Sequence, residues 1–115
     1  MSLIFKICLM ADWKKPEHIH EYQGSPKDRA DGFLHFSTEE QLPGTLAKYY
    51  GDADEVLLVA VNPAALGPAL KYEPSRDGKL FPHLYAPLSY EHVKWVKLVS
   101  RDEAGRFALP LDAHG

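Results

Sequence analysis

The fold is decided by residues 55–61, Glu-Val-Leu-Leu-Val-Ala-Val, a continuous apolar run in the middle of the chain. A short run of this kind, rich in β-branched residues, predicts a buried strand in the middle of a sheet. The pair Asn62-Pro63 ends the run, because proline has no N–H to continue the ladder. The segments on either side must therefore supply the neighbours of a central strand.

Outward from this strand, short apolar segments alternate with turns that contain glycine and proline. Apolar, β-prone composition predicts further strands at residues 3–9, 33–36, 70–73 and 93–99. Residues 81–85 include Pro82, which predicts an irregular segment or an edge strand. Residues 76–79 predict a polar hairpin loop, and residues 102–109 a closing hairpin.

One main helix is expected. Ser37 and Thr38 each begin a capping-box pattern, which predicts a helix that starts there and runs to Tyr50. Pro43 lies inside it, so either the opening turn is distorted or the regular helix starts nearer Pro43. Single helical turns are expected at 11–15 and 64–67. Many strands with one main helix predict an α+β fold.

Composition sets limits on the function. The 115 residues predict a single domain, 1–115, with a core over roughly 3–109. A formal charge of −3 makes nucleic acid an unlikely partner, since binding it needs a basic face. No apolar run reaches the length needed to span a bilayer, and the single Cys8 cannot form an internal disulfide. We expect a cytoplasmic protein with no membrane partner.

The first candidate site is His35, which interrupts an apolar segment and is followed by Ser37 and Thr38 at a helix start. On a strand, His35 and Ser37 point to the same face. A helix start offers N–H groups to a phosphate or a carboxylate. The alternative is a hydrogen-bonded core histidine beside an ordinary helix cap, and on the sequence alone this alternative is favoured.

The second candidate is Glu73, at the end of a predicted strand, and the third is the pair His83 and Tyr85. A carboxylate at a strand end can orient a ribose hydroxyl or stabilise developing positive charge. The spacing of His83 and Tyr85 places them on one face if the segment is extended. The alternatives are a solvated strand-end glutamate, which the sequence alone favours, and a half-buried aromatic stripe.

A metal site is a weaker hypothesis. His18 and His20 lie two residues apart, as chelating ligands on a strand do, and His35 or His83 would supply a third ligand. Glu21 does not have the spacing of the glutamate in a cupin-type metal motif, no glycine precedes the pair, and a surface loop is the favoured interpretation. We therefore expect no metal. Cys8 is expected to be an apolar filler of the first strand.

The stretches Gly-Phe-Leu-His-Phe-Ser-Thr at 32–38 and Phe-Pro-His-Leu-Tyr-Ala-Pro-Leu at 81–88 are the most specific features of the chain. Together with Ile-Phe-Lys-Ile at 4–7, Asn62-Pro63 and Tyr72-Glu73, they make it resemble the bacterial domain-of-unknown-function family 952. The resemblance extends over roughly residues 3–109. Relatives carry a Tyr-His pair where this chain has Phe5-Lys6, and glycine where it has Ala86.

The resemblance implies an ADP-ribosylation-like fold, in which two small, mostly antiparallel sheets enclose an NAD cleft. It places His35, Ser37 and Thr38 on one side of the cleft, and Glu73, His83 and Tyr85 on the opposite side. In this arrangement Glu73, His35 and His83 are the catalytic candidates. The residues that would bind the cofactor are Lys6, Ser37, Thr38 and Tyr85.

Three functions follow from these observations. The first is an NAD-dependent enzyme that transfers ADP-ribose, with NAD as the cofactor. The second is a non-catalytic domain that binds a nucleotide or a phosphorylated small molecule, which the replacement of histidine by Lys6 favours. The third is an enzyme with a metal held by histidines. In the first two, the expected partner is a small molecule or nucleotide.

Overall fold

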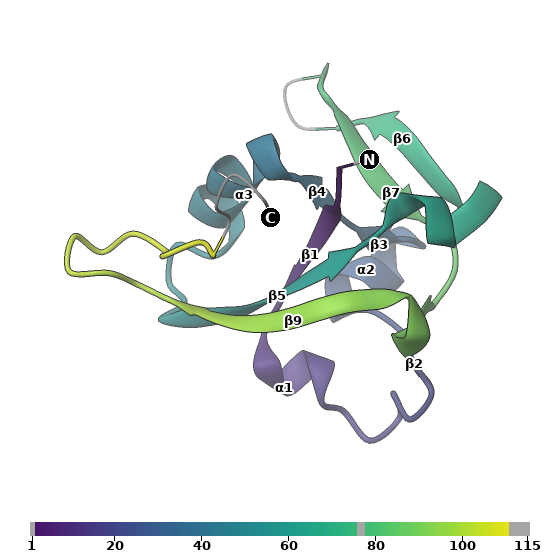
Figure 1. Ribbon diagram of the computed structural model, residues 1–115, viewed down its shortest axis with the longest axis horizontal. Coiled ribbons are helices and arrows are strands. Elements are labelled where there is room, and N and C mark those ends of the chain that lie inside the picture. The colour runs from purple at the N-terminus through teal and green to yellow at the C-terminus, as the bar shows by residue number, and fades with distance from the viewer. Residues whose placement is uncertain (1, 76–77, 111–115) are drawn as a thin grey trace.

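A computed structural model describes residues 2–75 and 78–110, which form a mixed fold of several antiparallel sheets and few helices (Figure 1). A four-stranded sheet has the order β4 (Ser37–Thr38), β1 (Ile4–Cys8), β5 (Glu55–Val61), β9 (Val93–Ser100). A three-stranded sheet has the order β3 (Leu34–His35), β7 (Leu80–Leu84), β6 (Leu70–Pro74). A two-stranded sheet pairs β2 (Glu21–Tyr22) with β8 (Leu88–Ser89). The family resemblance implies two sheets, and the third consists of only these two short strands.

The central strand is the one that the apolar run predicts. β5 (Glu55–Val61) lies between β1 (Ile4–Cys8) and β9 (Val93–Ser100) and pairs antiparallel with both. Residues 56–61 are all buried, whereas the outer strand β9 has mostly exposed residues. Burial on both faces explains why this strand does not alternate between apolar and polar residues.

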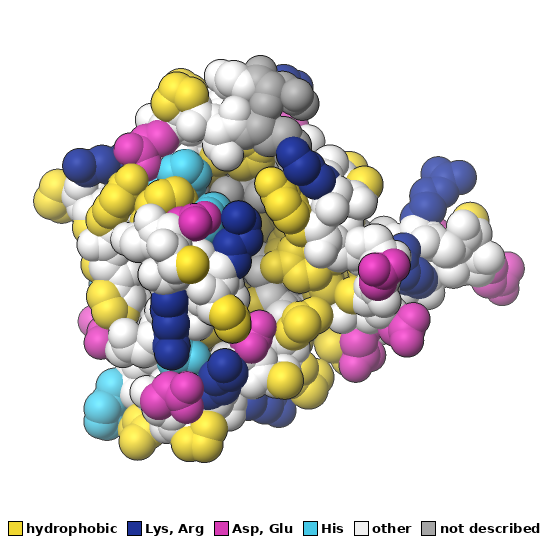
Figure 2. Space-filling model, turned by 180° about the vertical axis from the view of Figure 1, so that it is seen from behind, with side chains coloured by type: hydrophobic (Ala, Val, Ile, Leu, Met, Phe, Trp, Pro, Cys, Tyr) yellow, Lys and Arg dark blue, Asp and Glu magenta, His cyan; other side chains and the backbone are white. Residues whose placement is uncertain are grey.

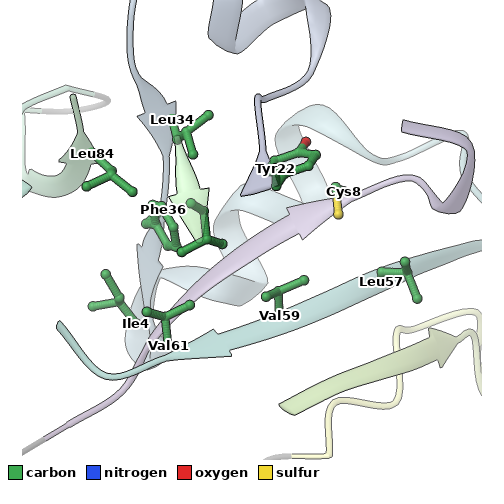
Figure 3. Close-up of a cluster of buried hydrophobic side chains, with 10 residues drawn as sticks. Ile4, Cys8, Tyr22, Leu34, Phe36, Leu57, Val59, Val61 and Leu84 are labelled. Carbon is green, nitrogen blue, oxygen red and sulfur yellow. The ribbon is translucent and has the colours of Figure 1, made fainter. Parts of the chain in front are cut away.

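The two faces of β5 belong to two separate cores. On one face, Leu57, Val59 and Val61 pack with Tyr22 and with residues from β3 and its neighbourhood (Figure 3). On the other face, residues 56, 58 and 60 pack against Leu42 and Leu46 from the main helix. Because side chains alternate along a strand, one seven-residue segment serves both cores.

The main helix is shorter than predicted. A 3₁₀ turn, η1 (Glu39–Gln41), precedes α3 (Leu42–Tyr49), so that Pro43 falls in the first turn, where its missing N–H costs nothing. The Gln41 side chain accepts a hydrogen bond from the Thr38 N–H at 3.0 Å, which corresponds to the second of the two capping boxes. Both effects expected of Pro43 are present: a tight opening turn and a late start.

The prediction of one strand over residues 33–36 is wrong. The segment forms two short strands, β3 (Leu34–His35) in the three-stranded sheet and β4 (Ser37–Thr38) in the four-stranded sheet. Between them, the N–H of Phe36 donates to the carbonyl of Pro82 at 3.0 Å. The chain therefore passes from one sheet to the other within three residues, and this crossing places His35 and Ser37 in different sheets.

The prediction of an irregular segment or edge strand around Pro82 is also wrong. β7 (Leu80–Leu84) is the middle strand of its sheet, between β3 and β6 (Leu70–Pro74). In an antiparallel pair the N–H and C=O of one residue face the same neighbour. The missing N–H of Pro82 therefore lies beside Phe36, where β3 has ended and only the Pro82 carbonyl is needed.

A second helix, α2 (Pro26–Asp31), was not predicted, although the sequence carries its signals. Ser25 is the N-cap, proline occupies the first helical position, and the Asp28 carboxylate completes a capping box. Gly32 ends the helix with a φ of 87°, a left-handed conformation that favours glycine. The capping-box pattern is hard to recognise here because its fourth residue, Asp28, is an aspartate rather than the usual glutamate or glutamine.

The remaining elements are short. The helical turns expected near 11–15 and 64–67 are present as α1 (Met10–Trp13) and the 3₁₀ segment η2 (Pro63–Ala69). Another 3₁₀ turn, η4 (Tyr90–His92), leads into β9, and a bridge between Arg101 and Phe107 closes the predicted last hairpin. Of the predicted loop at 76–79, Arg76 and Asp77 lie outside the described residues. No helix in the described parts of the chain is long and apolar enough to cross a membrane.

The double role of β5 leads to a stability prediction. Leu58 is completely buried, and Leu58→Ala is expected to lower the free energy of unfolding by about 2 to 5 kcal/mol, because it leaves a cavity beneath α3. Leu98 lies in β9 with 49% of its surface exposed, so Leu98→Ala is the matched control and is expected to cost under about 1 kcal/mol. Urea denaturation followed by circular dichroism measures both, and equal losses would contradict the central position of β5.

Candidate functional site

A cavity lies where α2 and the three-stranded sheet meet β1, β4 and α3, with about 670 Å³ of empty space that is partly open to solvent. On the face opposite to the view of Figure 1, acidic, basic and histidine side chains gather around a hollow (Figure 2). The cavity is lined by charged residues, by His35 and His83, by hydroxyl groups and by aromatic rings. These rings belong to Phe36, Tyr49, Tyr50 and Phe81.

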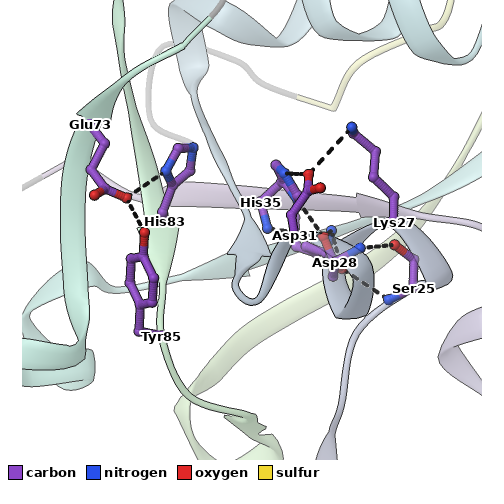
Figure 4. Close-up of polar contacts among 9 residues, drawn as sticks. Ser25, Lys27, Asp28, Asp31, His35, Glu73, His83 and Tyr85 are labelled. Atoms are coloured by element: carbon purple, nitrogen blue, oxygen red, sulfur yellow. Dashed lines mark hydrogen bonds and ion pairs between the residues drawn. The ribbon is translucent and has the colours of Figure 1, made fainter.

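One wall of the cavity is built around the carboxylate of Asp28, which is 2% exposed. The ammonium of Lys6, buried in β1, lies 2.9 Å from Oδ2 and 3.2 Å from Oδ1. The Oδ1 atom also accepts the backbone N–H of His35 at 3.1 Å and lies 2.6 Å from its Nδ1 (Figure 4). The Oδ2 atom accepts the N–H of Ser25 at 2.9 Å. Asp28 thus joins β1, α2 and β3.

These contacts keep Asp28 ionised. Burial by itself raises the pKa of its carboxyl group. The hydrogen bond with His35 and the charge and hydrogen bond of Lys6 outweigh burial and lower that pKa well below the ordinary value. A buried charge with this many partners is an anchor of the structure, and removing one partner leaves another charge or N–H group without its bond.

The imidazole of His35 is held from both sides. Its Nδ1 contacts Asp28, and its Nε2 lies 2.9 Å from Oδ2 of Asp31, the last residue of α2. The ammonium of Lys27 lies 3.4 Å from the same Asp31 oxygen. Both ring nitrogens of His35 therefore contact carboxylates of the same helix, and the half-buried ring connects β3 to that helix.

A second polar group lies on the neighbouring strands. His83 Nδ1 lies 2.9 Å from Oε1 of Glu73, and the hydroxyl of Tyr85 donates to the same oxygen at 2.6 Å. The hydrogen bonds from Tyr85 and then from His83 lower the pKa of Glu73. The bond to Glu73 in turn raises the pKa of the Tyr85 hydroxyl. Glu73 is therefore an ionised carboxylate with two donors on one oxygen.

Phe33 connects the two polar groups. Its ring stacks on His83 with centroids 4.1 Å apart and an interplanar angle of 26°, and it contacts the ring of His35 at 4.6 Å. It also reaches Tyr85, at 5.2 Å between centroids. His35 and His83 are direct partners in the β3–β7 register, with ring centroids 5.7 Å apart. One aromatic side chain thus fixes the relative positions of both histidines.

The structure brings only part of the predicted site together. Of the predicted residues, Lys6, His35, Ser37 and His83 line the cavity. The Oγ of Ser37 lies 3.2 Å from the Thr45 hydroxyl, and Thr38, Glu73 and Tyr85 are not among the lining residues. The expectation that His83 faces His35 across a cleft is wrong, because the two residues are side by side on adjacent strands.

Sequence reasoning missed three residues that organise the site. Asp28 and Asp31 belong to the helix that was not predicted, and the capping pattern that begins at Ser25 would have placed Asp28 at its N-terminus. No local signal shows that these carboxylates contact β1 and β3. The sequence predicts Phe33 as part of a short strand, whereas it lies just before β3, stacks on His83 and contacts His35.

The described residues do not form a metal centre. In residues 2–75 and 78–110, no three histidine, cysteine or acidic side chains are arranged to hold one ion. His18, a proposed ligand, is buried, and its Nδ1 accepts the N–H of Gln23 at 3.1 Å. Burial also lowers the pKa of His18. Cys8 packs in a core as its strand position predicts, and burial raises the pKa of its thiol to about 12.

Two kinds of comparison place the chain among known proteins. The sequence model of a family described as protein of unknown function (DUF952) matches residues 7–96. The crystal structure of protein CC0527 from Caulobacter crescentus is 40% identical, with a TM-score of 0.82 over 92% of this chain and 93% of that chain. The solution NMR structure of CC0527 is 41% identical, with a TM-score of 0.78 over 92% and 91% of the two chains. No curated protein matches the chain.

Asp28 has several hydrogen-bond donors besides Lys6, and this gives a second stability prediction. Asp28→Ala leaves the buried ammonium of Lys6 and the N–H groups of Ser25 and His35 without an acceptor, so a loss of about 3 to 5 kcal/mol is expected. Lys6→Met leaves Asp28 with its other donors and is expected to cost less than half as much. Urea denaturation of the two variants measures the difference. A larger loss for Lys6→Met would contradict the central role of Asp28.

The lowered pKa of Asp28 also predicts an acid dependence. Its ionised form is stabilised in the folded state, so this contribution is complete above the ordinary carboxyl pKa of about 4 and is lost as pH falls towards the lower folded value. The difference in Tm between wild type and Asp28→Asn is therefore expected to be constant from pH 7 to 5 and to narrow below about pH 4. Calorimetry at a series of pH values measures it, and a difference that does not change with pH would refute this account.

Proposed function

This chain belongs to the DUF952 family of proteins of unknown function, as its sequence predicts, and we propose that its cavity binds a small molecule of the nucleotide class. The observation that carries this proposal is the combination of aromatic walls with a surface ammonium, that of Lys27, at the cavity. Lys6 and Asp28 also line the cavity but are paired with each other, whereas Lys27 is paired only loosely, with Asp31. An anionic group on the ligand would be attracted to the Lys27 ammonium.

Lys27 is the residue best placed to contact such an anion. Lys6 is already paired with Asp28 at 2.9 Å in the interior, so its charge is neutralised there. The ammonium of Lys27 lies at the surface, with 59% of the side chain exposed, and its contact with Asp31 is looser, at 3.4 Å. An exposed pair of this kind contributes little free energy, so Lys27 can turn to a phosphate at low cost. The anion contact predicted for Lys6 is therefore assigned to Lys27 in this proposal.

The remaining walls fit the other parts of a nucleotide. Aromatic rings from Tyr49 and Tyr50 offer flat surfaces to a base. The hydroxyls of Ser37 and Thr45, 3.2 Å apart, are polar groups of the kind that bind sugar hydroxyls. Concave, mostly apolar sites with a few fixed polar groups are typical of small-molecule binding sites.

Titration followed by amide NMR tests this function. NAD⁺, ADP-ribose and nicotinamide are added separately to ¹⁵N-labelled protein, and saturable shifts are expected at residues 35–37, Phe81 and His83, which line the cavity. Lys27→Met is expected to weaken binding of the two phosphate-containing probes about tenfold, equivalent to the loss of about one charge-assisted hydrogen bond. Lys97→Met, on β9 and over the Trp95 ring, is the control and should bind as wild type does. Failure of all three probes to shift these amides at millimolar concentration would contradict the proposal.

A second candidate is the enzymatic version of the same function, transfer of ADP-ribose from NAD⁺ on an ADP-ribosylation-like fold. The specific observation in its favour is Glu73. Both of its hydrogen bonds within the described residues go to Oε1, so Oε2 is available to a ribose hydroxyl while the ionised group stabilises positive charge. In this reaction the bond between ribose C1′ and the nicotinamide nitrogen breaks, and its electron pair leaves with nicotinamide. An acceptor hydroxyl then bonds to C1′ and releases its proton.

Release of nicotinamide tests this second candidate. Incubation of the protein with NAD⁺, with water or added protein as acceptor, is expected to release nicotinamide detectable by chromatography. Glu73→Gln, which keeps the shape of the side chain and removes its charge, is expected to reduce the rate by at least about a hundredfold. Binding without release in wild type would leave the cavity a binding site and eliminate the enzyme.

A further inference from the structure

The two histidines of the cavity differ in what they can offer a ligand. We propose that Glu73 holds His83 with its proton on Nδ1, so that Nε2 is the hydrogen-bond acceptor through which the cavity selects a ligand with a hydroxyl or amide N–H donor. This inference rests on the proposed binding function and names the polarity of the ligand group recognised there. His83 is thus a specificity-determining residue and Glu73 a positioning residue.

The position of the proton follows from the partner of Nδ1. Glu73 Oε1 lies 2.9 Å from His83 Nδ1 and accepts the Tyr85 hydroxyl at 2.6 Å. An ionised carboxylate can only accept hydrogen bonds, so the ring nitrogen that contacts it must be the donor. In a neutral imidazole with a proton on Nδ1, the other nitrogen carries a lone pair. Figure 4 shows that nitrogen on the side of the ring away from Glu73.

The surroundings of the ring direct Nε2 towards the cavity. One face of the His83 ring is covered by Phe33, stacked at 4.1 Å, and the Nδ1 edge is covered by Glu73. His83 lines the cavity although Glu73 does not, so the edge that reaches the cavity is the one opposite Nδ1. Among the hydrogen bonds of the described residues, none involves His83 Nε2, whereas its side chain is only 6% exposed. A ligand in the cavity meets this acceptor on a side chain that is almost completely shielded from solvent.

His35 cannot take the same role. Its Nδ1 and Nε2 contact Asp28 at 2.6 Å and Asp31 at 2.9 Å, so neither nitrogen is left as an acceptor. The two oxygens of Asp28 are likewise occupied by the donors of Lys6 and His35 and by a backbone N–H of α2's cap. The nitrogen that remains to accept a bond from a ligand therefore belongs to His83. A ligand without a donor at that position would leave it buried and unpaired.

The first test needs no ligand. Long-range ¹H–¹⁵N correlation spectra of ¹⁵N-labelled protein at pH 7.5 report which ring nitrogen carries the proton, and the His83 signals are assigned by their loss in His83→Asn. The expected result is the neutral tautomer with Nδ1 protonated. Glu73→Gln, whose amide oxygen can still accept from Nδ1, should keep that tautomer, whereas Glu73→Met should populate the other. An Nε2–H tautomer or a charged ring in wild type would overturn the inference.

The second test measures recognition, with ADP-ribose as the probe and affinity read from NMR shifts. His83→Leu is expected to weaken binding about five- to hundredfold, the range for one buried bond lost. His83→Gln, whose amide oxygen can occupy the place of Nε2, should recover part of the affinity. His92→Leu, in η4 at the surface, is the control and should leave affinity unchanged.

The outcomes separate the two proposals. Equal affinity of wild type and His83→Leu, with both proteins folded by their amide spectra, would overturn recognition through Nε2 while the binding function stands. Failure of ADP-ribose, NAD⁺ and nicotinamide to bind wild type would overturn the binding function and recognition together. The tautomer measurement decides the positioning by Glu73 in either case.

Discussion

The carboxylate of Asp28 is the contact on which the arrangement of the site depends. It is almost completely buried, and its partners come from β1, from the cap of its own helix and from both the backbone and the ring of His35. A buried carboxylate is stable only where its lone pairs are occupied, and the folded chain here supplies an ammonium and several N–H groups at close range. The same contacts hold α2 against both larger sheets, and the cavity lies beside this junction.

The crossing at Phe36 explains why there is a cavity in this place. Because the chain leaves β3 after His35 and enters β4 at Ser37, neighbouring residues belong to different sheets, which diverge from that point (Figure 1). The hydrogen bond from Phe36 to Pro82 ties the crossing to the middle strand of the smaller sheet. Pro82, which predicts an edge strand or an irregular segment, fits into the central strand β7 because β3 ends at His35, beside it. Backbone geometry therefore determines where the polar side chains are brought together.

His35 and His83 differ chemically, although they pair directly across β3 and β7. Two aspartates of one helix occupy both nitrogens of His35, whereas a single glutamate occupies one nitrogen of His83. Phe33 contacts both rings. A carboxylate that lies beside only one ring nitrogen turns the other into an acceptor. The site thus combines a histidine with both ring nitrogens in contact with carboxylates and a histidine with only one nitrogen in such a contact.

The sequence by itself determined those strands and helix ends whose signals lie within a few neighbouring residues. The apolar run at 55–61 specified a central strand, because burial on both faces leaves no room for alternation, and the pattern that begins at Thr38 located the start of the main helical region. His35 and His83 stood out because they interrupt apolar segments. Most of the signals for α2 were also present, in Ser25, Pro26 and Gly32.

Only the tertiary structure decided which of these residues meet. The contacts of Asp28 with Lys6, and of Glu73 with His83 and Tyr85, join residues 22, 10 and 12 positions apart. A carboxylate on a short helix looks the same in the sequence whether it faces solvent or an ammonium in the core. Burial, register and the crossing between sheets are properties of the whole chain, because each depends on segments that pair across it. For that reason the sequence named the histidines, and only the fold assigned one of them to the structure and left the other open to the cavity.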